Sequence, residues 1–181
     1  MKVYINPEVV MVNDKLLTYN EKGSAMLTEL YRNHIGDYPK FFKMDTLSKL
    51  GFVASELLLQ AEGQSRFEPR DDRAIIFFNR SASLQADTVY QATIQDMDNY
   101  YPSPAAFVYT LPNIVTGEIA IRNKYYGETS FIVLPEYDPK IMAQQLQHAF
   151  HDPMTTSILG GWLDCTDENH FEAELYIISK Q

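Results

Sequence analysis

Two short apolar segments constrain the fold of this chain more than any other feature. Residues 74–78, Ala-Ile-Ile-Phe-Phe, form an uninterrupted apolar run, and residues 130–134, Ser-Phe-Ile-Val-Leu, form a second run of the same kind. A strand that is apolar on both sides must be covered on both faces, which is typical of strands between layers of helices. The sequence therefore predicts an α/β fold.

Helical and extended patterns alternate around these two runs. Helices are expected at residues 24–35, behind the N-cap residue Asp45, at 86–97, at 113–124 and, after Asp138-Pro139, up to about Phe150. Strands are expected at residues 2–5, 9–12, 155–163 and near 171–177, and the polar residues 166–169 are typical of a hairpin turn. The pattern predicts one domain, residues 1–181, with a mixed sheet of about five strands, helices on both faces and a C-terminal β-hairpin.

The charge of the chain excludes several classes of partner. It has 15 basic and 24 acidic side chains, a net charge of −9, and no compensating basic run. Such a protein repels phosphate backbones and anionic lipids, so neither nucleic acid nor a membrane surface is an expected partner. The single cysteine, Cys165, allows neither an internal disulfide nor a cysteine-based zinc site. Because no signal peptide or spanning segment is evident, we expect a cytoplasmic protein. We also expect no bound cofactor.

Several segments occur in the order and spacing of a known family. The clearest is residues 111–122, Leu-Pro-Asn-Ile-Val-Thr-Gly-Glu-Ile-Ala-Ile-Arg, which contains Asn113 and Gly117 and is followed by Gly127 and the apolar run at 130–134. Upstream lie Phe-Phe-Lys-Met-Asp at 41–45 and the run at 75–78, and downstream lies Leu-Gly-Gly, which contains Gly160 and Gly161. This ordered set resembles the N-terminal half of the β-ketoacyl-acyl-carrier-protein synthases. The resemblance implies a thiolase-like half-fold over most of the chain.

The resemblance also indicates where a catalytic nucleophile should lie. In the family, this nucleophile is a cysteine just after the second buried strand, at the start of a helix, where the helix N-terminus stabilises a thiolate. The family's spacing from Asn113 leads to Glu136, in the run Leu-Pro-Glu-Tyr at 134–137, which contains no cysteine. A carboxylate cannot hold an acyl chain as a thioester. Cys165 lies beyond the Gly-Gly segment and is expected to be a small buried side chain.

The histidines do not replace the missing chemistry. The family's two catalytic histidines belong to a C-terminal half that this sequence lacks, so the resemblance implies a truncated and non-catalytic protein. His148 and His151 are spaced i, i+3 with only Asp152 nearby, and we expect solvated residues at a helix end rather than a metal site. The remaining histidines, His34 and His170, stand apart in the sequence.

Three functions are compatible with this pattern. The preferred hypothesis is a non-catalytic auxiliary subunit of fatty-acid or polyketide-type synthesis, similar to a chain-length factor, that binds an active synthase or an acyl-carrier protein. The alternatives are a condensing enzyme whose partner chain supplies the nucleophile and histidines, and a homodimeric scaffold without acyl chemistry. In each case we expect a homo- or hetero-dimer, because the family dimerises through its core sheet. Glu136 either imitates a charged intermediate or helps decarboxylate a bound malonyl group, or it is a surface residue without a role.

Two further features bear on partners. Arg66, Arg70, Arg73 and Arg80 cluster in the sequence and could dock an acidic carrier protein, or could simply be solvated. In the helix after Glu136, Met142, Leu146, Ala149 and Phe150 share one stripe, whereas the glutamines lie elsewhere. Burying such glutamines without hydrogen bonds costs roughly 1–3 kcal/mol for each group. We therefore expect this helix to face water or a polar partner, which counts against simple complementation by a separate C-terminal half.

Overall fold

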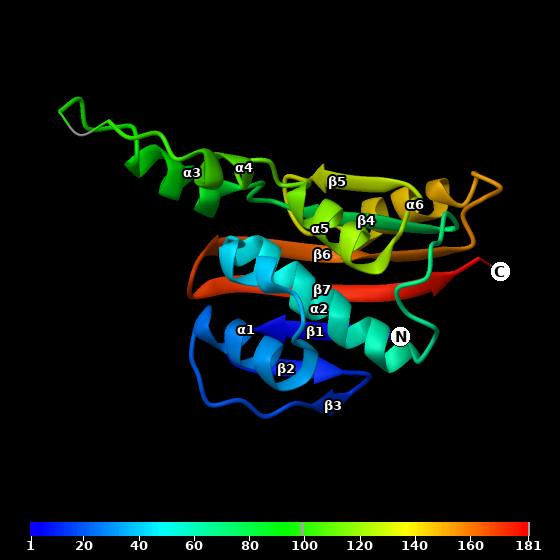
Figure 1. Ribbon diagram of the computed structural model, residues 1–181. Helices are drawn as coiled ribbons and strands as arrows, with labels where there is room; N and C mark the ends of the chain where they lie inside the picture. The colour runs from blue at the N-terminus through cyan, green and yellow to red at the C-terminus, as the bar shows by residue number, and fades with distance from the viewer. Residues whose placement is uncertain (99, 181) are drawn as a thin grey trace.

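A mixed seven-stranded sheet organises the computed structural model, which describes residues 1–98 and 100–180 (Figure 1). The strands are β1 (Lys2–Asn6), β2 (Val9–Val12), β3 (Lys15–Leu16), β4 (Arg73–Asn79), β5 (Thr129–Val133), β6 (Ser157–Asp167) and β7 (His170–Ser179). Their order across the sheet is β3-β2-β1-β7-β6-β4-β5, and β4 is parallel to β5 and to β6 while the other neighbours are antiparallel. The mixed sheet and the C-terminal hairpin are confirmed. The sheet exceeds the expected five strands because the strands expected at 2–5 and 9–12 join it beside β7 as β1 and β2, and β3 adds a short strand at its edge.

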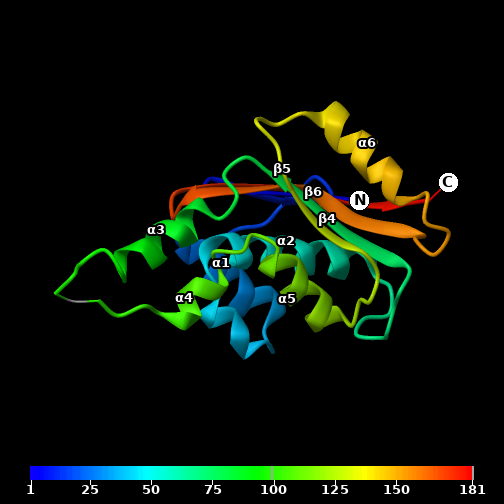
Figure 2. The same ribbon diagram turned by 90° about the horizontal axis from the view of Figure 1, so that it is seen from above.

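Helices cover the two faces of the sheet unequally. They are α1 (Ala25–Leu30), which continues into a π-helical turn at Tyr31–Ile35, a 3-10 helix at Pro39–Lys43, α2 (Thr46–Glu62), α3 (Leu84–Ala92), α4 (Pro104–Val108), α5 (Ile114–Asn123) and α6 (Pro139–Ala149). Figure 2 shows α1, α2 and α5 on one face of the sheet and α6 on the other. Helices on both faces are therefore confirmed, although α6 is alone on its face among the described helices.

The alternation of side chains along β4 explains why it is buried throughout. Ile75 and Phe77 point to the cluster formed with α2, whereas Ile76 and Phe78 point to the cluster formed with α6. All of the residues of β4 are buried. The apolar run at 74–78 thus lies between two helical layers, as the sequence predicts.

Helix α2 is the central element of the larger core. Its N-cap residue is Asp45, as predicted, and a carboxylate oxygen of Asp45 accepts a hydrogen bond from the backbone N–H of Ser48 at 3.0 Å. The helix ends at Gly63, whose φ of 70° is in the left-handed region. Gly51 lies where α2 approaches α5 most closely, because an added Cβ there would be 2.5 Å from Val115 Cγ2.

Two expectations about secondary structure are wrong. The helix expected at 86–97 starts at Leu84 and ends at Ala92. Its last turn tightens through hydrogen bonds from the N–H groups of Thr93 and Ile94 to residues three positions back, and these β-branched residues are poor helix formers. The run at 130–134 is not buried on both faces, since β5 is an edge strand and Val133 is 50% exposed.

Part of the sheet surface on the α6 side has no helix over it. Along β7 the burial alternates, with Phe171, Ala173 and Leu175 buried toward α2, while Glu172 and Glu174 are half-exposed on the opposite side. On this open side Tyr4 donates a hydrogen bond to Glu172 at 2.8 Å. The strands β1 and β7 therefore carry a polar surface where β4 and β6 carry an apolar one.

Candidate functional site

The segment between β5 and α6 contains Glu136, the position at which the sequence predicts the functional site. The backbone N–H of Leu134 donates to the carbonyl oxygen of Asn79 at 2.7 Å, which holds the segment at the carboxyl ends of the parallel strands β4 and β5. In open α/β sheets, ligands bind at these strand ends. Leu134 is buried and Glu136 is exposed. Glu136 thus lies between a parallel strand and a helix N-terminus, as predicted, but its carboxylate faces solvent.

The N-terminus of α6 is already occupied by a side chain of the chain itself. One carboxylate oxygen of Asp138 accepts hydrogen bonds from the N–H groups of Lys140 and Ile141, at 2.9 and 3.1 Å. These free N–H groups are the ones that stabilise an anion at a helix N-terminus. Because Asp138 takes them, little of the helix field is left for a second anion beside it.

Tyr137 links this segment to the open side of the sheet. Its ring packs edge-on against Trp162, with centroids 5.3 Å apart, and its hydroxyl donates to Glu174 at 2.9 Å. Burial, followed by the hydrogen bond to Glu174, raises the pKa of Tyr137 to about 12. The hydroxyl is therefore protonated at neutral pH and acts as a donor rather than as a base.

Helix α6 packs against the sheet through a single apolar stripe. Met142, Leu146 and Ala149 are buried, whereas Gln144 and Gln145 are exposed. This confirms the prediction that the helix after Glu136 faces water on its polar side. Gly160 lets the helix approach β6, since an added Cβ there would lie 2.9 Å from Leu146 Cδ2 and 2.7 Å from the carbonyl oxygen of Ile76.

Other motif residues serve the backbone in different ways. Gly161 has a φ of 146°, and an added Cβ would be 2.1 Å from the carbonyl oxygen of Glu174. An added Cβ at Gly127 would be 2.4 Å from the carbonyl oxygen of Arg73, so Gly127 serves close approach to β4, while the left-handed Lys124 ends α5. An added Cβ at Gly117 would have nothing within 4 Å, so Gly117 makes no tight helix contact. Asn113 is the N-cap residue of α5 without a capping side-chain hydrogen bond.

Comparison with known proteins bears on the fold alone. No family model matches the sequence, and no curated protein matches it. One similar solved structure is the ishigamide ketosynthase/chain length factor, with a TM-score of 0.69, 14% identity, and coverage of 99% of this chain and 60% of that one. Another is the ketosynthase ApeO in complex with its chain length factor ApeC from Xenorhabdus doucetiae, with a TM-score of 0.66, 11% identity, and coverage of 99% and 77%.

These likenesses extend over nearly the whole chain. The chain has a ketosynthase-like, thiolase-like α/β fold. It spans 60% of the length of the first of these chains. The expected fold class is therefore confirmed, whereas identities of 14% and 11% carry no statement about activity.

Within this ketosynthase-like fold, Cys165 does not have the environment of a reactive nucleophile. It is 1% exposed on β6, within the cluster around α2, and its Sγ contacts the carbonyl oxygen of Asp167 at 3.4 Å. Burial, and then the neighbouring carboxylates beginning with Asp45, raise the pKa of Cys165 to about 12. Reactive cysteines have a lowered pKa, so the expectation of a small buried side chain is confirmed.

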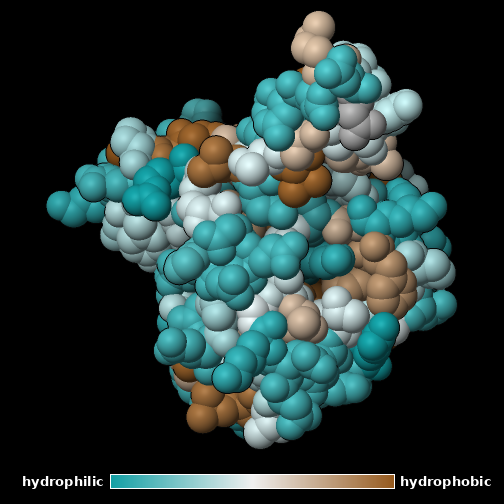
Figure 3. Space-filling model, turned by 90° about the vertical axis from the view of Figure 1, so that its left-hand side faces the viewer, coloured by the Kyte–Doolittle hydropathy of each residue, from teal (hydrophilic) through white to brown (hydrophobic). Residues whose placement is uncertain are grey.

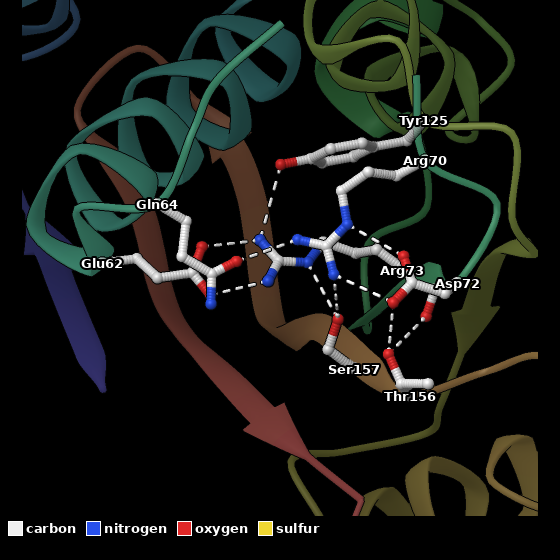
Figure 4. Close-up of polar contacts among 8 residues, drawn as sticks. All are labelled: Glu62, Gln64, Arg70, Asp72, Arg73, Tyr125, Thr156 and Ser157. Carbon is white, nitrogen blue, oxygen red and sulfur yellow. Dashed lines mark hydrogen bonds and ion pairs between the residues drawn. The ribbon is translucent and has the colours of Figure 1, made fainter. Parts of the chain in front are cut away.

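The four clustered arginines do not form a common surface. Arg73 is 2% exposed, and its guanidinium forms a paired contact with Glu62 at 2.6 and 2.8 Å and a hydrogen bond to Ser157 at 3.0 Å (Figure 4). Arg70 pairs with Asp72 at 2.9 Å. Through these contacts the guanidinium of Arg73 on β4 holds together Glu62 at the end of α2 and Ser157 at the start of β6.

The other two arginines differ from each other. Arg66 donates to Glu56 at 2.6 Å and to Asn123 at 2.7 Å, so it is also used inside the fold. Arg80 has an exposed side chain, and its backbone N–H points to Asp164. The geometry therefore does not favour docking by Arg66, Arg70 or Arg73, and docking by Arg80 stays a prediction.

The four histidines are exposed at the surface. The rings of His148 and His151 lie 4.9 Å apart on the exposed end of α6, and His170 contacts Asp167 at 2.8 Å. In residues 1–98 and 100–180, no three histidine, cysteine or acidic residues gather as a metal ion would require. No helix in the same residues combines the length and the apolar character needed to cross a bilayer.

Two features went unpredicted. One is the buried carboxylate of Glu56, which is 1% exposed inside α2 and pairs with Arg66; an acid within an apolar helical stripe was the available signal. The other is a groove of about 560 Å³ at the carboxyl ends of β4 and β6, lined by Arg80, Asp164 and Glu172 among others. Its residues come from four separate strands and loops, so no local pattern marks it.

Proposed function

We propose that this chain is a non-catalytic auxiliary subunit, similar to a chain-length factor, that binds an active ketosynthase of fatty-acid or polyketide-type synthesis. The observation that carries the proposal is the ketosynthase-like fold. At the position to which the family resemblance of the sequence leads for the nucleophilic cysteine, the chain has Glu136, which is exposed. Both similar structures contain a ketosynthase with a chain length factor.

The chemistry of the segment supports a role without catalysis. A thioester-linked acyl-enzyme needs a thiolate, and no sulfur is present from Leu134 to Asp138. Asp138 uses the helix N–H groups that a thiolate would need, and Cys165 is buried on the other face of the sheet. Glu136 is then a surface residue without a role in acyl transfer.

The edge of the sheet supports pairing with a partner. Among the described residues, β5 is paired with β4 alone, so its outer edge is open. Thr129–Val133 contains no proline, lysine or other charge. Edges of this kind are prone to pair with another strand unless such residues protect them.

The open polar side of β1 and β7 argues against the two-chain condensing enzyme. A separate C-terminal half would have to cover Glu172 and Glu174, which already take hydrogen bonds from Tyr4 and Tyr137 in half-exposed positions. Covering these carboxylates desolvates them without new partners, which is costly. The homodimeric scaffold is disfavoured by the net charge of −9 that each copy carries.

Native mass spectrometry tests the proposal. The chain is mixed with a complete ketosynthase from the same organism, and a complex of one copy of each is expected at micromolar concentration. The same mixture should elongate an acyl-carrier-bound substrate, while this chain alone should not. Absence of any hetero-complex would reject the proposal, and so would covalent uptake of an acyl group by this chain alone.

Val133→Lys places a charge on the open edge of β5 at a residue that is 50% exposed. If β5 pairs with the ketosynthase, this variant should fold normally and lose the complex. Leu16→Lys on β3 is the matched control, because Leu16 is 70% exposed at the opposite edge of the sheet.

A further inference from the structure

The segment that carries α3 and α4 projects away from the sheet (Figures 1 and 2). We call residues 84–98 and 100–111 the arm. Among its described residues Ala86 alone is buried. The helices of the arm touch through Tyr90 and Phe107, whose ring centroids are 5.3 Å apart. The arm therefore contributes little to the core and most of its surface to solvent.

The exposed surface of the arm is strongly apolar. Large hydrophobic side chains that are exposed on it are Leu84, Val89, Met97, Tyr100, Tyr101, Phe107, Val108 and Leu111. Tyr101 is 76% exposed and Met97 is 89% exposed. Figure 3 faces the end from which the arm projects, and on this side of the molecule brown and tan atoms lie among larger teal areas. Apolar side chains gathered in this way on a projecting segment are typical of a protein–protein contact.

The charge of the arm selects the kind of partner. From residue 84 to residue 111 the sequence contains three acidic side chains, Asp87, Asp96 and Asp98, and no lysine, arginine or histidine. A second copy of this chain, with its net charge of −9, would bring like charges to this surface. A groove on a partner that is apolar at its centre and edged with lysine or arginine complements both the apolar side chains and the negative charge of the arm.

A cavity at the base of the arm indicates that the surface is incomplete without a partner. It has a volume of about 360 Å³ and lies between the arm and the start of α2, with Met44, Val89 and Tyr109 in its walls. Gln85 also lines it, and the buried Oε1 atom of Gln85 has no hydrogen bond partner among the described residues. Such an orphan acceptor costs roughly 1–3 kcal/mol, which a donor entering the cavity would recover.

The charges around the cavity fix the character of that donor. Lys43 and Lys49 line it together with Asp45 and Glu168, so the formal charges of its walls balance. A neutral donor, such as an amide or a hydroxyl group on an apolar stem, fits these walls better than an ion.

We propose that the arm is a second element, in addition to the open edge of β5, that docks this chain to its ketosynthase, by entering a groove on that protein that is apolar and edged with basic residues, while a neutral donor side chain fills the cavity beside Gln85. The inference rests on the proposed function for the identity of the partner. It adds that the arm is the surface in contact and that the opposing surface of the ketosynthase is basic. It also excludes a second copy of this chain as the partner of the arm.

Affinity measurements with arm variants test the inference. Met97→Ser combined with Tyr101→Ser removes apolar area at exposed positions, and Asp96→Lys combined with Asp98→Lys reverses the charge. Each should leave the circular dichroism spectrum and Tm unchanged and should weaken the complex with the ketosynthase about tenfold or more. The charge variant should also lose the salt dependence of the wild-type affinity. Leu16→Ser, at a 70% exposed residue of β3, is the control and should bind as the wild type does.

The outcomes separate this inference from the proposed function. A complex whose affinity is unchanged in both arm variants overturns docking by the arm and leaves the proposed function standing. Absence of a complex with the wild-type chain rejects the proposed function and the inference with it. Self-association of the wild-type chain that the serine variant abolishes shows that a second copy occupies the arm, and so overturns the choice of partner.

Discussion

The hydroxyl group of Tyr137 donates a hydrogen bond to the carboxylate of Glu174 at 2.9 Å, and the Nζ of Lys2 approaches the other oxygen of that carboxylate at 3.1 Å. The segment before α6 is thereby joined to β7 and β1 across the part of the α6 side of the sheet that α6 leaves uncovered. This part is a hydrogen-bonded polar surface.

The exposure of Glu136 leads to a prediction about a cysteine introduced at this position. Glu136→Cys places a thiol at the position to which the family resemblance of the sequence leads, but Asp138 still occupies the N–H groups of α6. The new thiol should therefore react with iodoacetamide as an ordinary exposed cysteine does, and it should take up no acyl group from an acyl-thioester donor. Intact-protein mass measurement checks both statements, and a stable acyl adduct would contradict the second.

The native cysteine provides the internal control for that experiment. Cys165 is 1% exposed and its pKa is raised to about 12, so the thiolate is scarce at neutral pH. The wild-type protein should resist alkylation while folded and should be labelled at one site in denaturant. Rapid labelling of the folded wild type would show that β6 opens locally.

Gly161 and Gly117 form a second, matched comparison. Gly161→Ala combines a left-handed φ of 146° with a contact of 2.1 Å to a backbone oxygen, so it should destabilise the protein by about 3 kcal/mol or more. Gly117→Ala fills open space within α5 and should raise the free energy of unfolding by about 0.5–1 kcal/mol. Urea denaturation measures both, and a destabilised Gly117→Ala would indicate a partner contact at that position.

These glycines also show how far the sequence could lead. Strands, helices and the hairpin followed from local patterns, such as the apolar run at 74–78 and the caps at Asp45 and Asp138. The family resemblance predicted that Gly160 and Gly161 matter. It could not separate them from Gly117, because close approach depends on which backbone lies opposite, and that is set by the packing of distant segments.

The arginines fail as predictors of a docking surface for the same reason. A row of basic residues in a loop gives no sign that Glu62, Asp72 and Glu56 will lie opposite three of them. The arm shows the converse case. Its length and apolar side chains are visible in the sequence, but only the fold shows that α3 and α4 leave the core instead of packing into it.

The buried ion pair of Arg73 predicts a large effect on stability. Arg73→Met leaves the Glu62 carboxylate, 9% exposed, without its two hydrogen bonds, and should lower the free energy of unfolding by about 3–5 kcal/mol. Arg70→Met is the control, because the pair of Arg70 and Asp72 is 22% and 31% exposed and should contribute about 1 kcal/mol or less. Equal losses in the two variants, measured by urea denaturation, would contradict the burial argument.

Asp72 predicts how stability responds to acid. Hydrogen bonds from Arg70 and then Thr156 lower the pKa of its carboxyl to about 2, below the value of about 3.9 for an unfolded aspartate. A lowered folded-state pKa means that the charged carboxylate stabilises the fold above about pH 4 and that this contribution disappears as the pH falls toward about 2.

Solvent screening at a side chain that is 31% exposed holds this contribution to about 1 kcal/mol. Asp72→Asn should therefore be less stable than the wild type near neutral pH, and the difference should shrink as the pH is lowered from about 5 to about 2. Asp71→Asn, at the exposed neighbouring carboxylate, is the matched control and should follow the wild-type curve throughout. The measurement is urea denaturation at a series of pH values. A gap between wild type and Asp72→Asn that stays constant down to the lowest pH would mean that the carboxyl group binds Arg70 equally well when protonated, and would remove the ion pair from the account of this loop.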